Sequence, residues 1–267
     1  MITVELAASP YGVITILRNS VTGAYAYEQD ACTQSEADSN GVSLAPYIHA
    51  FFDLLQQAQA QRVLMIGGGG GTLATLLYRA GTQVTVLDTN AKAFALARTY
   101  FQLPTDVDCV VADGAEYLMR HNTVFDAIVL DAYVGNRIPP HLCSNAFLKL
   151  VESRLDKNSG AFFANVHTGH DFDLSVDKFS RSTSQVWRNV RLLDASGRIN
   201  RNAILMAGAV GNLKKPKMRV WPDTFTEELE FELNRLEFRS CRLEDSHRSN
   251  AGFRRLAAHQ ANAETPS

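Results

Sequence analysis

Residues 63–77 read VLMIGGGGGTLATLL, an apolar run followed by five consecutive glycines and then by a helical pattern. Glycine loses more conformational freedom on folding than any other residue, so five in succession need a physical reason. A tight turn between a strand and a helix requires only one or two of them. The stretch therefore indicates a loop whose backbone N–H groups approach a ligand closely, at a helix end that favours negative charge.

The segments on both sides of this loop alternate between strand-like and helical patterns. Strand-like runs lie at 62–66, 83–88, 108–112, 125–131 and 160–165. Helical patterns follow them at 71–80, 91–101, 114–120, 143–155 and 170–182. Such alternation predicts right-handed βαβ crossovers and a mostly parallel sheet covered on both faces. Two last runs, 186–194 and 202–208, predict an antiparallel pair that completes a seven-stranded sheet in an α/β domain.

Two smaller regions flank this domain, which is predicted to cover 43–211 and to open with a helix near Ser43. Short strand-like runs separated by turn residues predict an N-terminal β-hairpin domain over 1–42, with strands at 2–6, 12–18 and 22–27. Residues 212–267 are predicted to form a C-terminal helix and a polar tail. Thr224 and Glu227 match a capping box for a helix ending near Phe238, and the tail from His247 is expected to be partly disordered.

Composition excludes several classes of function. The 267 residues carry a net charge of −2, which does not indicate binding to nucleic acid or to an acidic membrane surface. No apolar stretch reaches the roughly 18 residues that span a bilayer, and the N-terminus does not match a signal peptide. The four cysteines are scattered without metal-ligand spacing, so we expect a cytoplasmic protein without a metal site.

Acidic residues stand at the ends of successive predicted strands, where ligands bind in parallel sheets. Asp88 ends the second of these strands and is placed to accept both hydroxyls of an adenosine ribose. Asp113 and Gly114 follow the third strand, where a carboxylate accepts a hydrogen bond from an adenine amino group. A dinucleotide has less use for an acid there, and Thr72 replaces the third glycine of the dinucleotide fingerprint. The set favours an S-adenosylmethionine-type ligand.

With these residues in place, the chain resembles the spermidine synthase (polyamine aminopropyltransferase) family over about residues 3–210. SPYGVITI resembles the family's first hairpin, and Gln34 and Tyr47 fall near its characteristic Gln and Tyr-His stretch. The glycine loop resembles its GGGDGG, VTVLD its ribose-binding strand, ADGAEYL its adenine-side Asp-Gly, and FDAIVLDAYVG its catalytic FDVIIVDSSDP. The resemblance implies a Rossmann-like class I methyltransferase fold and a homodimer formed through the β-domain or the sheet edge. It implies a ligand site made of Gly67, Gly68, Gly69, Gly70, Gly71, Asp88, Asp113, Gly114, Asp131 and Gln34.

Two departures from the family pattern fall in the reacting region. The acidic residue of the glycine loop is Gly70 here, and the second carboxylate of the Asp-Ser-Ser-Asp segment is Val134. In the family these acids are implied to hold the cationic aminopropyl end and to take a proton from the attacking amine. Their loss weakens binding of two cations. Gly70 also leaves N–H groups facing the carboxylate of intact S-adenosylmethionine, so the sequence favours methyl transfer to an unidentified small-molecule acceptor.

The catalytic candidates are Asp131, Tyr133 and Tyr47. Asp131 ends the fourth parallel strand, above the expected sulfonium, and is assigned to orienting the acceptor or accepting its proton. The two tyrosines are placed to pack on the sulfonium as cation–π partners or to line the acceptor pocket, and Tyr47 also fits the core of its helix. Among the histidines, His49 is expected to be structural. His141 is either a lid residue or a surface group, and two further histidines, His167 and His170, flank a loop near the crevice.

Other interpretations stay open. The chain fits a true polyamine aminopropyltransferase that uses decarboxylated S-adenosylmethionine, with the missing acids supplied by Glu28, Asp30 or Glu36. It also fits a non-catalytic protein that binds an adenosyl ligand. A nicotinamide-dependent dehydrogenase is disfavoured by Thr72 and by the Asp113-Gly114 pair.

Overall fold

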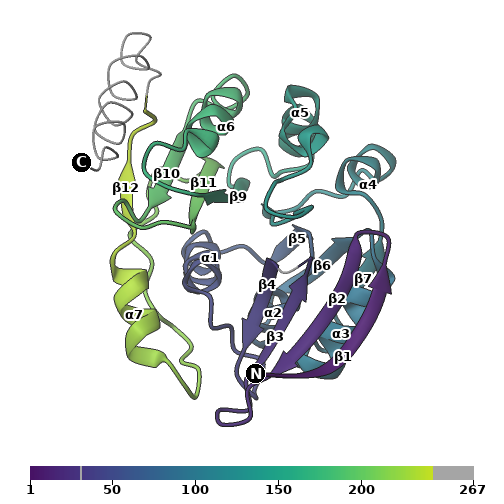
Figure 1. Ribbon diagram of the computed structural model, residues 1–267. Helices are drawn as coiled ribbons and strands as arrows, with labels where there is room; N and C mark the ends of the chain where they lie inside the picture. Colours follow the sequence, from purple (N-terminus) through teal and green to yellow (C-terminus); the bar gives the residue numbers. More distant parts are fainter. Residues whose placement is uncertain (31, 243–267) are drawn as a thin grey trace, which may run out of the picture.

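The chain forms two β-sheets, which Figure 1 shows as separate layers. The computed structural model describes residues 1–30 and 32–242. The smaller sheet is antiparallel and takes the order β1-β2-β3-β4. Its strands are β1 (Ile2–Ser9), β2 (Gly12–Arg18), β3 (Tyr25–Gln29) and β4 (Cys32–Ala37).

The larger sheet has eight strands in the order β12-β10-β11-β9-β8-β5-β6-β7. The five neighbouring strands from β9 to β7 in this order run parallel to one another. Beyond β9, the strands β11, β10 and β12 each pair with their neighbour in antiparallel fashion. The strands are β5 (Arg62–Ile66), β6 (Gln83–Asp88), β7 (Asp108–Val111), β8 (Ala127–Leu130), β9 (Ala161–Thr168), β10 (Val190–Asp194), β11 (Arg201–Gly208) and β12 (Glu237–Arg239).

Helices cover both faces of the larger sheet. On one face α1 (Pro46–Gln57), α2 (Thr72–Arg79), α3 (Ala91–Tyr100) and α7 (Thr226–Asn234) share a core with Val63 and Met65. On the other face α4 (Gly114–Arg120), η1 (Pro140–Cys143), α5 (Asn145–Ser153) and α6 (Ser175–Thr183) share a core with Leu64 and Ile66. Adjacent residues of β5 thus point to opposite faces, as the strand period of two requires.

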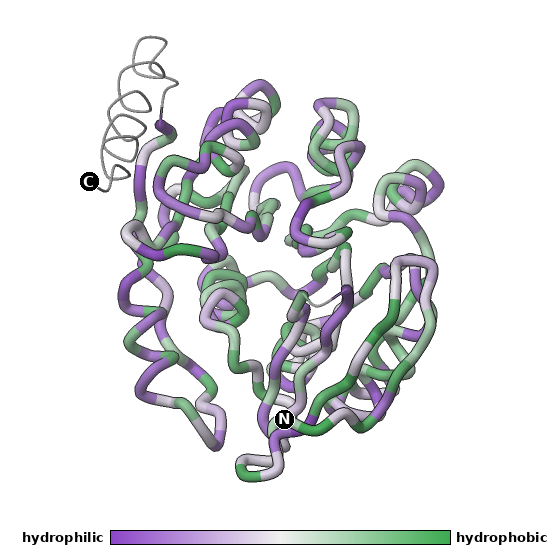
Figure 2. Tube along the Cα trace, viewed as in Figure 1, coloured by the Kyte–Doolittle hydropathy of each residue, from purple (hydrophilic) through white to green (hydrophobic). Residues whose placement is uncertain are grey.

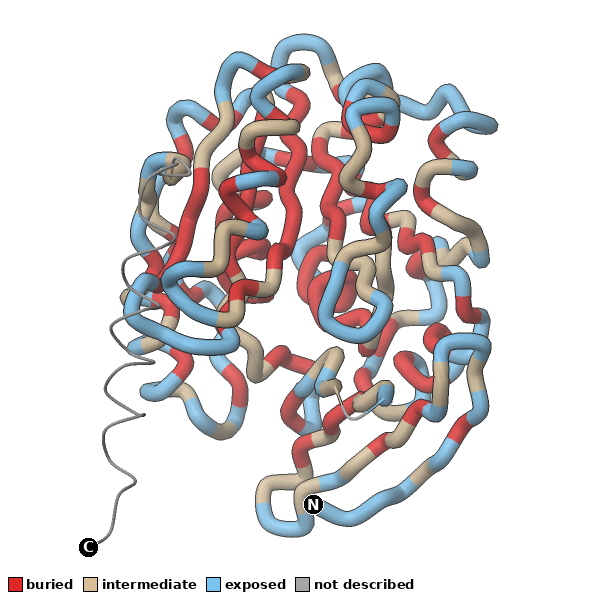
Figure 3. Tube along the Cα trace, turned by 45° about the horizontal axis from the view of Figure 1, so that its top comes forward, coloured by how far each residue is buried: buried red, intermediate tan, exposed pale blue. Residues whose placement is uncertain are grey.

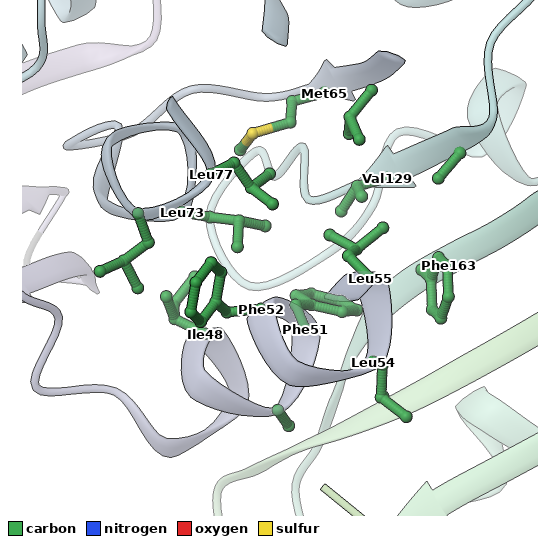
Figure 4. Packing of buried hydrophobic residues seen from close by; sticks show 14 of the residues in the cluster. Ile48, Phe51, Phe52, Leu54, Leu55, Met65, Leu73, Leu77, Val129 and Phe163 are labelled. Atoms are coloured by element: carbon green, nitrogen blue, oxygen red, sulfur yellow. The ribbon is translucent and has the colours of Figure 1, made fainter. Parts of the chain in front are cut away.

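The packing of α1 anchors the first of these cores. Figure 4 shows Phe51 and Leu55 of this helix pointing toward Val129 and Phe163 on the sheet, with Leu73 and Leu77 of α2 beside them. In Figure 2 α1 is mostly hydrophobic, whereas α7, which packs outside it, is mostly hydrophilic. Figure 3 shows buried residues concentrated on the strands of the larger sheet and exposed residues on the loops.

Aromatic side chains hold the smaller sheet against the end of α3. The ring of Tyr25 lies 5.4 Å from that of Tyr100, and Tyr27 lies 6.5 Å from Phe101. Phe101 and Tyr27 are both buried, with Ile14 and Ile16 of β2. Because these contacts fix the sheet in place, β4 lies directly above the glycine loop.

The predicted α/β fold, with a mostly parallel sheet behind an N-terminal antiparallel sheet, is confirmed. The larger sheet has one strand more than expected, because residues 237–239 pair with β10 rather than continue the C-terminal helix. The capping box expected at Thr224 and Glu227 is wrong: α7 begins at Thr226, after Phe225 in a left-handed conformation. The strand β4 was also missed, and the tail from His247 lies outside the described residues.

The antiparallel end of the sheet is held by buried ion pairs. Asp194 at the end of β10 is 2% exposed and accepts hydrogen bonds from Arg201 at 2.6 Å and Arg239 at 2.8 Å. Arg239 of β12 also donates to Asp177 of α6 at 2.7 Å. These pairs join β10, β11, β12 and α6, and they fix the loop that leads into β11.

Candidate functional site

A cavity of about 890 Å³ opens at the carboxyl ends of the parallel strands. Its floor is formed by the glycine loop after β5, by Asp88 at the end of β6, by Asp113 after β7 and by Asp131 after β8. Its opposite wall comes from β4 and from the first turn of α1. The acids predicted at successive strand ends therefore meet in one pocket, as the geometry of parallel sheets requires.

Gly67 allows the loop to pass against the end of β8. Its φ is +97°, and a Cβ there would collide with the carbonyl group of Asp131. Its N–H donates to the Leu87 carbonyl at 2.8 Å, while Asp131 N–H donates to the Ile66 carbonyl at 2.8 Å. A side chain would separate two strand ends that both carry pocket residues.

Replacing Gly67 by alanine is expected to lower the free energy of unfolding by about 2–3 kcal/mol, because the substitution combines an unfavourable φ with a backbone collision. Urea unfolding measures the effect. Gly211→Ala is the matched control, since its Cβ would meet no atom of the described residues within 4 Å and its φ lies outside the left-handed range. Equal stability losses in the two variants would contradict the close-approach role of Gly67.

The second half of the glycine loop does not face the cavity. Gly70 and Gly71 are buried and lie behind the lining formed by Gly67, Gly68 and Gly69. The Gly70 N–H donates to Ser35 Oγ of β4 at 2.9 Å. The expectation that this N–H faces a ligand carboxylate is therefore wrong, because the docked N-terminal sheet occupies it.

The same contact decides what position 70 tolerates. A Cβ at Gly70 would lie 2.9 Å from Ser35 Cβ and 3.0 Å from Phe101 Cδ1. An aspartate at position 70 would require the side chain of Ser35 or of Phe101 to move. The absence of an acidic residue at position 70 of the glycine loop is thus linked to the close packing of β4 against that loop.

Asp88 is tied to the loop and to the next helix. Its Oδ2 accepts the Gly68 N–H at 3.0 Å, and its Oδ1 accepts the Asn90 N–H at 2.8 Å. Burial raises the pKa of Asp88, and these backbone hydrogen bonds oppose the rise. The carboxylate therefore lies at the predicted ribose position, with its orientation set before a ligand binds.

Asn90 is a pocket residue that the sequence analysis missed. Its Oδ1 caps α3 by accepting the Lys92 N–H at 3.1 Å. Its Nδ2 is buried without a hydrogen-bond partner among the residues that the structure describes. Buried donors normally find partners, so this group is available to a ligand acceptor in the cavity that Asn90 lines.

Asp113 and Gly114 form the adenine side of the predicted site. Asp113 Oδ1 caps α4 through the Ala115 and Glu116 N–H groups, and its Oδ2 lies 2.8 Å from His141 Nε2. Burial alone would raise the pKa of Asp113, but the hydrogen bonds from His141 and the backbone outweigh it and lower the pKa. A Cβ at Gly114 would lie 2.5 Å from Ile66 Cγ2, so the helix needs glycine to pack on β5. His141 thus lies at the pocket rather than on an unrelated surface.

Asp131 lies at the floor of the cavity between two hydrogen-bond donors. Asn165 Nδ2 donates to its Oδ1 at 2.8 Å, and Tyr47 Oη donates to its Oδ2 at 3.4 Å. Desolvation by the surrounding protein raises the pKa of Asp131 to about 6, although both hydrogen bonds oppose the rise. A carboxylate with such a pKa is ionised near neutral pH and is still a useful proton acceptor.

The two predicted tyrosines differ in what their hydroxyl groups do. Tyr47 points its hydroxyl to Asp131 and packs its ring edge-on against Phe51 at 6.0 Å, so it serves both the site and the core. Tyr133 donates to the Asn165 carbonyl at 2.8 Å and accepts the His167 N–H at 2.9 Å. Its hydroxyl is occupied in holding β9, and only its ring remains for the pocket.

Four carboxylates line the cavity: Glu36, Asp88, Asp113 and Asp131. Of the acids suggested as substitutes, Glu36 of β4 is among the lining residues, whereas Glu28 and Asp30 are not. Burial, followed by the charge of Glu28, raises the pKa of Glu36. Within the described residues, no lysine or arginine lines this cavity, and Val134 is exposed at its rim.

The remaining predicted residues divide between the pocket and its surroundings. Gln34 and His167 line the cavity, whereas His170 does not. His49 is buried and bonded through Nε2 to the Ser43 carbonyl at 2.7 Å, which confirms its structural role. In the described part of the chain no three His, Cys, Asp or Glu side chains are grouped to hold a metal, and no helix has the length and hydropathy to cross a bilayer.

Two asparagines behind Asp131 were not predicted. Asn165 of β9 lines the cavity, and so does Asn202 of β11. They are 37 residues apart in sequence and become neighbours through the antiparallel pairing of the two strands. No local pattern marks them, because Asn165 is one polar residue within an apolar run and Asn202 belongs to the polar start of its strand.

The chain is similar in sequence to known transferases. A family model described as a methyltransferase domain matches residues 63–152. A polyamine aminopropyltransferase of Neisseria meningitidis is 31% identical over 161 residues, which cover 58% of this chain and 59% of the relative. The enzyme of that name from Chromobacterium violaceum is 32% identical over 121 residues, which cover 43% of this chain and 46% of the relative. The match to the first of these curated relatives thus spans less than two thirds of its length.

Solved structures show the same fold over more of the chain. A probable spermidine synthase from Corynebacterium glutamicum superposes with a TM-score of 0.69 at 18% identity, over 89% of this chain and 90% of that one. A spermidine synthase in complex with the transition state analogue AdoDATO gives a TM-score of 0.64 at 21% identity, over 86% and 83%. The resemblance to the spermidine synthase-like family is confirmed, together with a methyltransferase-type domain.

Proposed function

We propose that this chain, with its confirmed resemblance to spermidine synthases, transfers an aminopropyl group from decarboxylated S-adenosylmethionine to an amine. One observation carries the proposal: besides Asp88 and Asp113, which are assigned to the nucleoside, the cavity is lined by two further carboxylates, Asp131 and Glu36, and, among the described residues, by no lysine or arginine. The donor carries a sulfonium and an ammonium, and the acceptor is also a cation before it reacts. Carboxylates stabilise all three charges. Intact S-adenosylmethionine adds a carboxylate that would face these acids without a cationic partner.

In this proposal the adenosyl part of the donor lies along the floor of the cavity. The Gly67–Gly69 backbone faces it, Asp88 accepts from the ribose hydroxyls, and Asp113 accepts from the adenine amino group. Asn90 adds a donor whose Nδ2 has no other partner in the described structure. The sulfonium then lies near Asp131, as it would above the end of β8.

The reaction is a single displacement. The acceptor nitrogen forms a bond to the aminopropyl carbon attached to sulfur, and the C–S bond breaks with its electron pair going to sulfur. The sulfonium becomes a neutral thioether, and the positive charge passes to the newly alkylated nitrogen. Because the acceptor starts as an ammonium, it must first lose a proton to Asp131, which frees the lone pair that attacks. The sulfonium is already activated, so the protein supplies alignment and the proton acceptor.

Glu36 takes the part of the second carboxylate that Val134 cannot supply. It lies where the main cavity meets a second cavity of about 490 Å³. The second cavity is partly apolar and suits the methylene chain of an amine; its apolar lining includes Leu44, Pro46, Ile199, Leu229 and Leu236. In this arrangement a cationic nitrogen of the acceptor is held at Glu36, part of its chain extends from there into the second cavity, and the reacting nitrogen approaches Asp131 in the main cavity.

Replacing Glu36 by glutamine is expected to raise KM for the amine acceptor about tenfold and to change kcat little, because it removes an attraction present in both ground and transition states. Steady-state kinetics with varied amine at saturating donor measures the effect. Glu28→Gln is the control, since Glu28 lies on the same sheet outside the cavity lining. A change in kcat alone would contradict the assignment.

Methyl transfer is the second candidate, and the substitutions at Gly70 and Val134 favour it. We place it second because the Gly70 N–H, which would have received the carboxylate of intact S-adenosylmethionine, donates to Ser35 instead. The names of the curated relatives also support aminopropyl transfer over methyl transfer.

Product analysis tests the proposal. The purified chain is incubated with each donor and a panel of diamines and polyamines, and the products are identified by mass spectrometry. Methylthioadenosine and an aminopropylated amine are expected from the decarboxylated donor. Formation of S-adenosylhomocysteine and a methylated amine from the intact donor would contradict the proposal and support the second candidate.

A further inference from the structure

Three polar side chains form a line that leads from the cavity into the antiparallel end of the sheet. Asn202 Nδ2 donates to Asn165 Oδ1 at 2.9 Å, and Asn165 Nδ2 donates to Asp131 Oδ1 at 2.8 Å. In the register of β9 and β11, Asn165 pairs with Ile204 and Asn202 with His167, so the two asparagines are diagonal neighbours. Asn165 is 2% exposed, and its two amide ends are both engaged.

The orientation of the Asn165 amide decides whether a hydrogen-bond donor or an acceptor faces Asp131. An asparagine amide presents an acceptor at one end and donors at the other, and rotation by half a turn exchanges them. With the NH₂ end toward Asp131, the carboxylate gains a hydrogen bond. With the carbonyl end toward Asp131, two acceptors face each other in a partly desolvated site, which is unfavourable.

We propose that Asn202 is a positioning residue: its NH₂ group holds the Asn165 carbonyl, so that Asn165 presents its own NH₂ group to Asp131. Asn202 lies on the strand that the buried pair of Asp194 and Arg201 fixes at its first residue. The start of β11 thus reaches the reacting carboxylate through two amides. Within the described structure Asn202 makes no hydrogen bond to Asp131, and it acts through Asn165.

The charge state of Asp131 depends on every group that faces it. Tyr47 approaches from α1 and donates to Asp131, whereas Tyr133, in the loop after β8, lies close without a hydrogen bond to it. Cys143 of η1 lies next to Tyr133, and burial raises its pKa to about 11. His167 of β9 and the acids Glu36 and Asp88 line the same cavity. Burial therefore favours the neutral form of Asp131, whereas the hydrogen bond that Asn165 donates favours its carboxylate form.

Asn202→Asp tests the proposal without any substrate. Aspartate at 202 can only accept while ionised, so the Asn165 amide has to rotate to donate to it, and its carbonyl then faces Asp131. The pKa of Asp131 is expected to rise by about one unit or more. Titration of ¹³C-labelled aspartate carboxyl groups by NMR measures it, with Asp131→Asn to assign the signal.

Asn200→Asp is the matched control for the added charge. Asn200 lies two residues away in the loop before β11, lines the same cavity, and has a φ of +49° that aspartate tolerates. Its side chain makes no hydrogen bond to Asn165 in the described structure. A larger shift in Asn202→Asp than in Asn200→Asp supports the proposal. Equal shifts would overturn it, because charge alone would then explain them.

Asn202→Leu keeps the test decisive if the aspartate variant does not fold. Leucine removes the donor and adds no charge, so a smaller upward shift is expected, of about half a unit. An unchanged Asp131 pKa would overturn the proposal. The catalytic meaning of the relay rests on the proposed function, whereas these titrations do not. A shifted carboxyl signal in a protein that makes no product would reject the function and keep the relay.

Discussion

Replacing Asp131 by asparagine is expected to lower kcat for aminopropyl transfer by about 10²–10⁴-fold, the range typical of removing a general base. The amide is nearly isosteric and accepts the Asn165 hydrogen bond, so the shape of the site is kept, and donor binding should weaken only through the loss of one carboxylate near the sulfonium. Steady-state kinetics with both substrates, and calorimetry for the donor, separate the two effects. A variant that retains most of its kcat would contradict the role of Asp131 as proton acceptor.

The same substitution is expected to stabilise the fold above pH 6. The folded-state pKa of Asp131 is raised from 3.8 to about 6, so the folded protein binds this proton more tightly than the unfolded chain. Stability from this group is therefore fully present below about pH 4 and is lost as the pH rises to about 6. The two units correspond to at most about 3 kcal/mol. Urea unfolding at pH 8 should show Asp131→Asn to be about 1–3 kcal/mol more stable than the parent, and a loss of stability there would contradict the account.

Replacing Asp194 by alanine is expected to lower the free energy of unfolding by about 3–5 kcal/mol, because it removes the buried carboxylate that two arginines share and leaves Arg201 only the half-exposed Asp171. Arg201 is 7% exposed and donates to Asp194 through Nε and Nη2, and Arg239 donates to it as well. Burial would raise the pKa of Asp194, but the two arginines outweigh burial and lower it. This contribution to stability is present above the unfolded-state pKa and is lost as the pH falls through the lower folded-state pKa.

Urea unfolding at pH 7 measures the loss, and Glu237→Ala is the control. Glu237 pairs with Lys215 at the surface, where its side chain is 71% exposed, so its removal should change stability by less than about 1 kcal/mol. A loss below about 1 kcal/mol for Asp194→Ala would show that the buried pairs do not hold this end of the sheet. Activity should fall with stability, since Asp194 holds the first residue of β11, the strand that carries Asn202.

The sequence predicts those site residues whose positions follow from the order of strands and helices alone. Gly67, Asp88, Asp113 and Asp131 each follow a parallel strand, and the carboxyl ends of such strands converge whatever the details of packing. Their meeting in one cavity needed no knowledge of tertiary contacts. The fold was predicted for the same reason, since alternating strands and helices leave few topologies.

Contacts between distant segments could not be predicted in this way. The Gly70 N–H is occupied because β4 docks above the loop, and that docking depends on Tyr25, Tyr27 and Phe101 packing around the end of α3. Asn165 and Asn202 meet only through the register of β9 and β11. The strand β12 is three residues long and is fixed by Arg239, whose partners lie on β10 and α6. In each case a long-range contact decides the structure of a segment with no local signal of its own.

One of these long-range contacts also bears on the choice between methyl transfer and aminopropyl transfer. Gly70 appeared to open a place for the carboxylate of intact S-adenosylmethionine, and the structure fills that place with Ser35. Glu36, which the sequence analysis named among three possible substitutes, lines the cavity. The acidic lining then favours a donor without a carboxylate.

Calorimetric titration of the purified chain with decarboxylated and with intact S-adenosylmethionine tests this claim most directly. The account predicts that the decarboxylated ligand binds at least about tenfold more tightly, which corresponds to about 1.4 kcal/mol. The Glu36→Gln variant shows whether that acid contributes to the preference. Tighter binding of intact S-adenosylmethionine by the unaltered chain would contradict the account and make methyl transfer the better proposal.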